Sequence, residues 1–253
     1  MRKGGTVLDK IAIISDIHGN IPALRSVLED IQTRKLDQII CLGDLVGKGP
    51  DSSEAVEIIK KVCAVTVKGN WDDFITKPTE IETIKWHQHQ LTVQHNQFLE
   101  ELPFSVEFLM SGRLIRLFHA SPRSYYDRIQ PWDPIERRLS MFENTSQTEN
   151  ILGSREPDVV FYGDIHNAYM QNIKGKTLCN VGSVGNPLDI PQASYAILEG
   201  NYGVEEAGGF SIQFVRVPYN IDLAINLAKE KRMPELEPYI KELTTAQYRG
   251  AHK

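Results

Sequence analysis

Residues 10–20 read KIAIISDIHGN, and this stretch decides the fold. Its first part, Lys10–Ser15, is apolar nearly throughout, which is typical of a strand with both sheet faces covered. Apolar residues at helical spacing over 21–32 then predict a helix. Two polar residues, Asp16 and His18, lie between these elements at the carboxyl end of the strand. Because open α/β sheets bind their ligands at that end, the motif is a candidate functional site.

The alternation of strand and helix continues along the chain. Residues 38–42 predict a second strand, 52–61 a second helix and 62–67 a third strand. This order is typical of a parallel sheet with right-handed crossovers. The sequence therefore favours an α/β fold.

Two polar excursions separate this first group of elements from the rest. Residues 72–103 predict a helix over 79–99, and residues 121–150 mix loop and helix. Further strands are expected at 106–110, 113–118, 158–162, 169–173, 177–180, 194–198 and 210–217, and a helix over 220–245. With no internal repeat and no low-complexity linker, we expect residues 1–253 to form a single domain. The two excursions are candidates for a lid.

Composition excludes several classes of protein. Of 253 residues, 28 are Lys or Arg and 33 are Asp or Glu, so the net charge is −5. Hydrophobic residues make up 41% and charged residues 24%, which is ordinary globular composition and excludes disordered and fibrous chains. A pI near 5.8 without a basic block argues against a protein that binds duplex nucleic acid.

The three cysteines, Cys41, Cys63 and Cys179, are far apart and form no C-x-x-C pair. They indicate buried thiols in a reducing compartment rather than a disulfide framework. The basic start, residues 1–10, has no apolar core of a signal peptide, and no segment reaches the ~20 apolar residues of a membrane helix. We therefore expect a cytoplasmic protein without a membrane partner.

Side chains that bind metals follow five of the predicted strands. They are Asp16, His18, Asp44, Asn70, His119, Asp164 and His166. These groups are too many for one zinc ion and enough for two divalent or trivalent ions that share a bridging carboxylate. Two metal ions about 3.5–4 Å apart are the arrangement used for in-line displacement at phosphorus.

The order D-x-H, G-D, G-N, a lone His and G-x-x-H resembles the calcineurin-like metallophosphoesterase superfamily over residues 10–200. The short motifs DIHGN at 16–20 and GDLVGKGP at 43–50 are similar to those of small bacterial and archaeal phosphodiesterases and diadenosine tetraphosphate hydrolases. The resemblance implies a four-layer α/β/β/α sandwich with small helical insertions and a dinuclear metal site at its edge.

The resemblance also implies a role for each candidate. Asp16, His18 and His166 would bind the first metal ion, Asn70, His119 and Asp164 the second, and Asp44 would bridge them together with a water or hydroxide. Asp44, Asn70 and His119 are the catalytic residues that it implies. The ions would lower the pKa of the bridging water, which attacks phosphorus in line with the leaving group.

Asp164 departs from the superfamily, which usually has histidine there. Three carboxylates and a bridging hydroxide balance two dications, and such oxygen donors favour manganese and iron. We predict Mn²⁺, or a mixed iron–manganese pair, as the cofactor.

Trp71 is a second departure, because many relatives have a histidine there that protonates the leaving oxygen. General acid catalysis contributes about 10²–10⁴-fold, so its loss favours substrates whose leaving group needs no proton. Alternatively, a metal-bound water or one of His87, His89 and His95 donates the proton.

Four residues are candidate substrate contacts: Asn20, Lys48, Arg123 and Tyr125. Asn20 is equally well explained as a helix N-cap, and Lys48 as a solvated lysine. Arg123 and Tyr125 belong to an aromatic and basic cluster that either stacks a purine and pairs with phosphates or forms the small core of its excursion. The other members of this cluster are Tyr126, Arg128 and Trp132.

We predict a dinuclear metal-dependent phosphoesterase that hydrolyses nucleoside or dinucleoside polyphosphates, such as ATP and diadenosine tetraphosphate, and activated phosphodiesters. Its partner is a small molecule. A serine/threonine protein phosphatase is disfavoured by Gly47–Gly49, where such enzymes have arginine, and by Trp71. A non-enzymatic interaction module on the same fold is disfavoured because six of the seven metal positions match the family.

Overall fold

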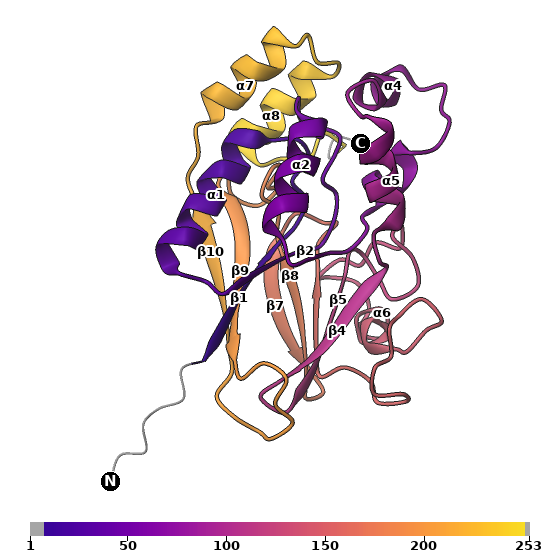
Figure 1. Ribbon diagram of the computed structural model, residues 1–253, viewed down its shortest axis with the longest axis vertical. Helices are drawn as coiled ribbons and strands as arrows, with labels where there is room; N and C mark the ends of the chain where they lie inside the picture. Colours follow the sequence, from indigo (N-terminus) through magenta and orange to yellow (C-terminus); the bar gives the residue numbers. More distant parts are fainter. Residues whose placement is uncertain (1–7, 251–253) are drawn as a thin grey trace.

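Two five-stranded sheets pack face to face in the computed structural model, which describes residues 8–250 (Figure 1). The basic start, on which the expectation of no signal peptide depended, lies mostly outside these residues. The first sheet has the order β10-β9-β1-β2-β3 and contains β1 (Asp9–Ile14), β2 (Gln38–Cys41), β3 (Val65–Thr66), β9 (Ala193–Gly200) and β10 (Ser211–Val217). The second has the order β4-β5-β6-β8-β7 and contains β4 (Ser105–Met110), β5 (Arg113–Phe118), β6 (Val159–Tyr162), β7 (Ala168–Ile173) and β8 (Lys176–Val181).

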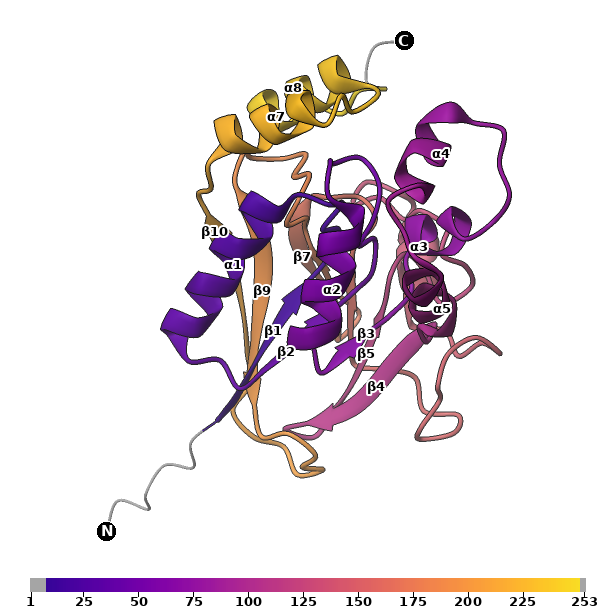
Figure 2. The same ribbon diagram turned by 45° about the horizontal axis from the view of Figure 1, so that its top comes forward.

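Helices cover the outer faces of both sheets. In Figures 1 and 2, α1 (Ile21–Arg34) and α2 (Ser52–Val62) lie over the first sheet, where their apolar residues form one core with that sheet's outer side chains. A second core lies between the sheets and includes Ile13 and Phe161. The outer face of the second sheet packs on a thinner layer that includes Ile129 and the 3₁₀ turn Ser140–Phe142, which α6 (Ile135–Leu139) precedes. The predicted four-layer sandwich is therefore confirmed.

Parallel pairing explains why the candidate residues gather. β1, β2 and β3 run parallel in one sheet, and β5, β6 and β8 run parallel in the other. Carboxyl ends of parallel strands meet at one edge, and here the edges of the two sheets also meet. The N–H of Asp164, which follows β6, donates to Oδ2 of Asp16, which follows β1, at 3.2 Å.

The polar excursion 72–103 is less continuous than its composition predicts. Instead of one helix over 79–99 it contains α4 (Glu82–Gln88) and α5 (Val93–Glu101), and α3 (Asn70–Ile75) precedes them. Thr92 separates the two helices because its hydroxyl accepts from the N–H of His95 and thereby caps α5.

Two more predicted elements differ. The helix expected over 220–245 is a pair, α7 (Ile221–Glu230) and α8 (Leu236–Thr245), and Pro234 lies in the break. The strand expected over 62–67 is the two-residue β3, because α2 continues to Val62. Among the described residues, none of the helices is both long and apolar enough to span a membrane.

Candidate active site

Five of the seven sequence-predicted ligands have a left-handed backbone. They are Asp16 (φ 54°), His18 (φ 48°), Asp44 (φ 54°), Asp164 (φ 64°) and His166 (φ 60°). This conformation costs a residue with a side chain about 1–2 kcal/mol. Backbone hydrogen bonds hold it, since the N–H of Asp16 donates to Gly43 O and the N–H of His18 to Asp44 O, both at 2.9 Å. Residues held in strained conformations in this way are typical of functional sites.

Two glycines let the backbone approach these ligands closely. A Cβ atom at Gly69 would lie 2.1 Å from Oδ1 of Asp44, and one at Gly163 would lie 2.6 Å from Oδ2 of Asp16. No other residue fits at either position without moving a candidate ligand. The pairing of glycine and ligand in the sequence therefore has a steric cause.

Three histidines turn the same ring nitrogen toward the centre. Each Nδ1 faces a backbone carbonyl oxygen: Val46 for His18 (3.0 Å), Leu42 for His119 (2.8 Å) and Asn186 for His166 (2.6 Å). A carbonyl oxygen accepts and does not donate, so each Nδ1 has the ring proton. Each Nε2 is then the atom available to a cation, and the carbonyl fixes the ring orientation, as in metal-binding histidines.

The atoms at the centre need a positive charge between them. Nε2 of His18 lies 3.2 Å from Nε2 of His166, and two ring nitrogens without protons repel at this distance. Oδ1 of Asp16 and Nε2 of His119 are buried and have no hydrogen-bond partner among the described residues. A metal ion would satisfy all four atoms, so the residues present fit a metal.

The same conclusion follows from the pKa values. Burial disfavours the charged ring of His119, but the carboxylates, Asp44 first, outweigh burial and raise its pKa to about 10. Burial also favours the neutral form of Asp16, but the neighbouring histidines, His166 first, outweigh it and lower the pKa of that carboxyl. A bound cation would replace the proton on His119, because metal and proton compete for the same nitrogen.

The candidate ligands form two overlapping groups. Asp16, His18 and His166 make one group, and Asp16, Asp44 and His119 make the other; within each group the ligand atoms lie within 4.8 Å of one another. Oδ2 of Asp44 lies 3.6 Å from Nε2 of His18 and 3.4 Å from Nε2 of His119, so this carboxylate reaches toward both groups. The arrangement is a candidate metal-binding cluster.

Asn70 and Trp71 begin α3 beside this cluster. Oδ1 of Asn70 accepts from the N–H of Trp71 at 3.1 Å, and the same N–H donates to Oδ1 of Asp44 at 2.8 Å. The Trp71 ring meets the His18 ring edge to face, with 5.9 Å between centroids. Asn70 is thus adjacent to the cluster, and its role as a ligand stays a prediction.

Asp164 has a partner that the sequence did not reveal. Its carboxylate accepts two hydrogen bonds from Arg128, from Nε at 2.9 Å and from Nη2 at 3.0 Å, and its Oδ1 lies 4.0 Å from Nε2 of His119. Arg128 neutralises the charge that Asp164 brings in place of a neutral histidine. The charge balance expected from three carboxylates and a hydroxide did not include this arginine.

Asp72 is a second residue that sequence reasoning missed. It is fully buried and accepts from the N–H groups of Asp44 (2.7 Å), Leu45 (2.9 Å) and Gly69 (3.0 Å). Burial, and then the charge of Asp44, raise its pKa to about 7. It joins the loops after β2 and β3, and its place at the third position of a helix is the signal that could have found it.

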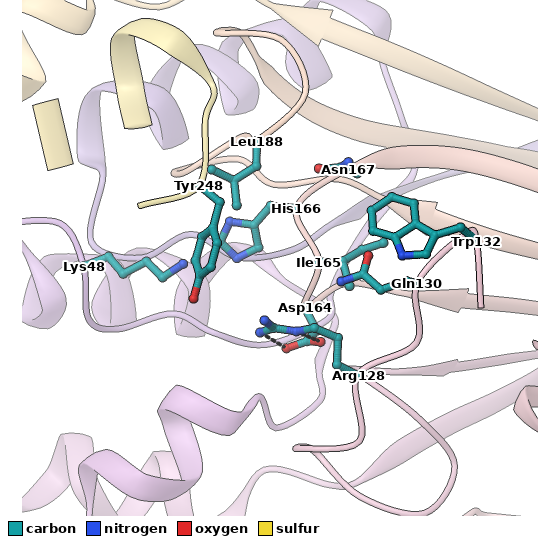
Figure 3. A pocket seen from close by; sticks show the side chains of 10 residues that line it. All are labelled: Lys48, Arg128, Gln130, Trp132, Asp164, Ile165, His166, Asn167, Leu188 and Tyr248. Carbon is teal, nitrogen blue, oxygen red and sulfur yellow. Dashed lines mark hydrogen bonds and ion pairs between the residues drawn. The ribbon is translucent and has the colours of Figure 1, made fainter. Parts of the chain in front are cut away.

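The structure brings one of the four candidate substrate contacts to the site's open side. Lys48 lines a pocket of about 340 Å³ next to Asp164 and His166 (Figure 3). Asn20 is buried, accepts from the N–H of Ala23 at 3.2 Å and so caps α1. The remaining two candidates, Arg123 and Tyr125, are not part of this pocket lining.

Arg123 and Tyr125 have partners within their own part of the fold. The guanidinium of Arg123 pairs with Asp127 at 2.7 Å, and the ring of Tyr125 packs on Phe104 with 4.9 Å between centroids. Two other members of the predicted aromatic and basic cluster, Arg128 and Trp132, do line the pocket.

Comparisons with known proteins agree with this chemistry. An uncharacterized protein of Methanocaldococcus jannaschii is 31% identical over 254 residues, which span 90% of this chain and 96% of the relative. A symmetrical bis(5'-nucleosyl)-tetraphosphatase of Thioalkalivibrio sulfidiphilus is 26% identical over 175 residues, which span 65% of this chain and 62% of that protein. The crystal structure of a metallophosphoesterase from Sphaerobacter thermophilus matches with a TM-score of 0.73 at 25% identity, over 94% of this chain and 99% of the other.

The family model of the calcineurin-like phosphoesterase superfamily domain matches residues 10–202. This range contains all seven candidate ligands and most of both sheets, including β2 to β9. The expected resemblance is confirmed: the chain belongs to the calcineurin-like phosphoesterase superfamily.

Proposed function

We propose that this phosphoesterase binds two metal ions at the cluster and hydrolyses nucleoside or dinucleoside polyphosphates and activated phosphodiesters. The observation that supports this most is the position of Asp44, whose Oδ2 lies within 3.6 Å of His18 and 3.4 Å of His119. One carboxylate oxygen between two histidines suits a bridge between two ions. Ions bound there would supply a water nucleophile at neutral pH and neutralise charge on the phosphate.

The chain's own residues divide this work. Asp16, His18 and His166 would bind one ion, and His119 would bind the other together with Asp44. By resemblance, Asn70 and Asp164 would complete the second position. The backbone carbonyls behind the three histidines keep the rings in place, which holds the reacting atoms in a fixed geometry.

The choice of leaving group follows from Trp71. Its indole occupies the place where many relatives have a proton-donating histidine, and it packs against the rings of His18 and Phe74. An indole N–H is not an acid at neutral pH. Good leaving groups, such as a nucleotide leaving from a polyphosphate or an aryl oxide, therefore suit the site better than an alkoxide.

The three histidines that offered an alternative donor lie elsewhere. His87 is buried with Nδ1 3.3 Å from Ser52, and Nε2 of His95 lies 2.8 Å from Glu57. His89 lines a separate pocket beside Trp86. None of these three residues lines the two pockets next to the cluster, which supports the leaving-group proposal.

The nucleotide part of the proposal has support from a relative. The protein from Thioalkalivibrio sulfidiphilus is named a bis(5'-nucleosyl)-tetraphosphatase, and its similarity covers 65% of this chain. Dinucleoside polyphosphates also have the leaving group that the Trp71 argument favours, because a nucleotide departs as a stabilised phosphate anion.

Steady-state hydrolysis tests the proposal. Metal-stripped protein reloaded with Mn²⁺ is assayed on diadenosine tetraphosphate, bis(p-nitrophenyl) phosphate and glycerol 2-phosphate. We expect turnover of the first two at about 10²-fold or more above the third, since that is the low end of general acid catalysis. Equal turnover of all three would show that another group donates the proton, and no turnover of any would favour the interaction module.

The proposed metals are Mn²⁺ or an iron–manganese pair. Imidazole and carboxylate ligands without sulfur are compatible with both, and with zinc. Elemental analysis of protein purified without added metal separates these cases. Manganese or iron at up to two equivalents agrees with the proposal, and zinc alone at two equivalents contradicts it.

A further inference from the structure

We propose that Tyr248 and Trp132 form the aromatic walls of a nucleoside subsite, in which Lys48 and Arg128 bind the phosphate groups. The inference rests on the proposed function and adds to it the part of the molecule that recognises the nucleoside. It also assigns a role to the carboxyl-terminal segment, which lies beyond the matched residues 10–202.

The carboxyl-terminal helices lie at the edge where the strands deliver the ligands. Figures 1 and 2 show α7 and α8, in yellow, next to the end toward which β1 runs. The two helices share a small core that includes Ile225, Tyr239 and Leu243, and α7 packs against α1. This addition to the family domain is therefore placed beside the candidate active site.

A buried hydrogen-bond network connects α8 and Arg249 to the candidate metal-binding cluster. Glu242 of α8 is fully buried and accepts from Nη2 of Arg249 at 2.6 Å and from Nδ2 of Asn186 at 3.2 Å. Asn186 also accepts from Nζ of Lys48 at 3.1 Å through its side chain, and its carbonyl oxygen faces Nδ1 of His166 at 2.6 Å. The residues before Arg249 are thereby fixed at the rim of the site.

Tyr248 and Trp132 line the pocket of about 340 Å³ next to the cluster. The Trp132 side chain is 73% exposed and Tyr248 is 46% exposed, which is unusual for rings of this size. In Figure 3 the two rings stand on opposite sides of the pocket, with Asp164 and His166 between them. Two exposed rings beside a phosphoryl-transfer site suit a purine or pyrimidine base, which every aromatic face can stack.

Two cationic side chains of the pocket lining suit the phosphate chain. Lys48 and Arg128 both line this pocket and a second one of about 190 Å³, which Tyr248 also lines. Lys48 donates to the neutral amide of Asn186, so its charge is not cancelled by that partner. Asp164 takes hydrogen bonds from two of the nitrogens of Arg128, and an arginine has five N–H donors. The pocket therefore presents the Lys48 ammonium, the N–H groups of Arg128 that Asp164 does not take, and two aromatic faces.

Equilibrium binding tests the subsite. AMP and ribose 5-phosphate, which lacks the base, are titrated into the Mn²⁺-loaded protein by calorimetry. Stacking of the base predicts that AMP binds about tenfold tighter than ribose 5-phosphate. Tyr248→Ala and Trp132→Ala should each lower AMP affinity about fivefold and leave ribose 5-phosphate unchanged. The control is Tyr202→Ala, because Tyr202 is equally exposed at 48% and lies outside these pockets.

The outcomes separate the subsite from the proposed function. Equal affinity for the two ligands, no AMP binding, or an equal effect of Tyr202→Ala overturns the subsite. The same preparations are assayed on bis(p-nitrophenyl) phosphate. Turnover of this diester with no preference for AMP leaves the proposed function intact and removes the subsite. A preference for AMP that depends on Tyr248, without any metal-dependent turnover, supports the subsite and contradicts the proposed function.

Discussion

Several single residues at this site have conformations or surroundings that lower the free energy of unfolding. Five candidate ligands have positive φ, and buried atoms such as Oδ1 of Asp16 and Nε2 of His119 have no hydrogen-bond partner among the described residues. An unpartnered buried polar atom costs about 1–3 kcal/mol, in addition to the backbone strain. Such costs persist in a fold when function requires the arrangement, and a cation would offset them.

Arg128 offers a test of the charge balance at the second metal position. Arg128→Ala removes the positive charge that pairs with Asp164 at 2.9 Å and leaves the cluster one unit more negative. We expect Mn²⁺ to bind about three- to tenfold tighter at low salt, because Arg128 is partly exposed and its charge is screened. Calorimetric titration with Mn²⁺ measures this. Unchanged binding, or weaker binding, would contradict this charge-balance account.

That the candidate ligands gather at one edge could be predicted from the sequence, because each lies within a few residues after the end of a strand. Because the strands run parallel, residues that follow their carboxyl ends lie close together at one edge of the sheets. Arg128 could not be assigned in this way, since its partner Asp164 is 36 residues away and nothing in the sequence pairs them. Tyr248 was missed for the same reason.

Among the elements, α4 buries a histidine that the candidate active site does not use. His87 is 1% exposed and lies between Ser52 and the rings of Trp71 and Trp86. Burial, with a smaller effect from the charge of Arg249, lowers its pKa from 6.5 to about 4. The folded protein therefore keeps this ring neutral over a pH range in which the unfolded chain protonates it.

This shift predicts a loss of stability in mild acid. Below pH 6.5 His87 becomes protonated in the unfolded state, whereas in the folded state it stays neutral until about pH 4. The free energy of unfolding should fall by up to about 3 kcal/mol across this window. Urea unfolding at several pH values, with His87→Gln as the comparison, measures it. Parallel pH profiles for the two proteins would contradict the assignment.

Element boundaries could be predicted where apolar periodicity was strong and failed where a local cap decided them. The strands other than β3, and the first two helices, appear close to their expected positions. The segments 79–99 and 220–245 each satisfied a helical pattern, yet both contain a break. The hydroxyl of Thr92 favours a new helix start at that position, and Pro234 cannot continue a helix, so each outweighs the apolar pattern.

At the scale of the whole molecule, the cluster joins the two sheets. Asp16 and Asp44 follow strands of the first sheet, and His119 and Asp164 follow strands of the second. Metal bound between them would link the layers at the edge where the apolar core ends. The fold class could be predicted for the same reason that the site could, since both follow from the strand–helix order. The lid role of the two excursions stays a prediction.

Metal should therefore stabilise the entire fold. A ligand that binds the folded state alone adds about 2.7 kcal/mol at a concentration 100 times its Kd. We expect the Tm of Mn²⁺-loaded protein to exceed that of chelator-treated protein by several degrees, with about 2–4 °C per kcal/mol at this chain length. Differential scanning calorimetry measures the shift. An unchanged Tm would show that no tight metal site spans the sheets.

The most direct test of a dinuclear phosphoesterase is metal-dependent turnover in a variant of the bridging carboxylate. Asp44→Asn is compared with Asp37→Asn, which alters an exposed carboxylate that accepts from the N–H of Lys10. Metal-stripped proteins are titrated with Mn²⁺ while hydrolysis of bis(p-nitrophenyl) phosphate is followed. We expect wild type and Asp37→Asn to reach full activity near two equivalents, and Asp44→Asn to lose about 10²-fold or more in kcat/KM. Activity that is independent of Mn²⁺, or that survives in Asp44→Asn, would contradict the account.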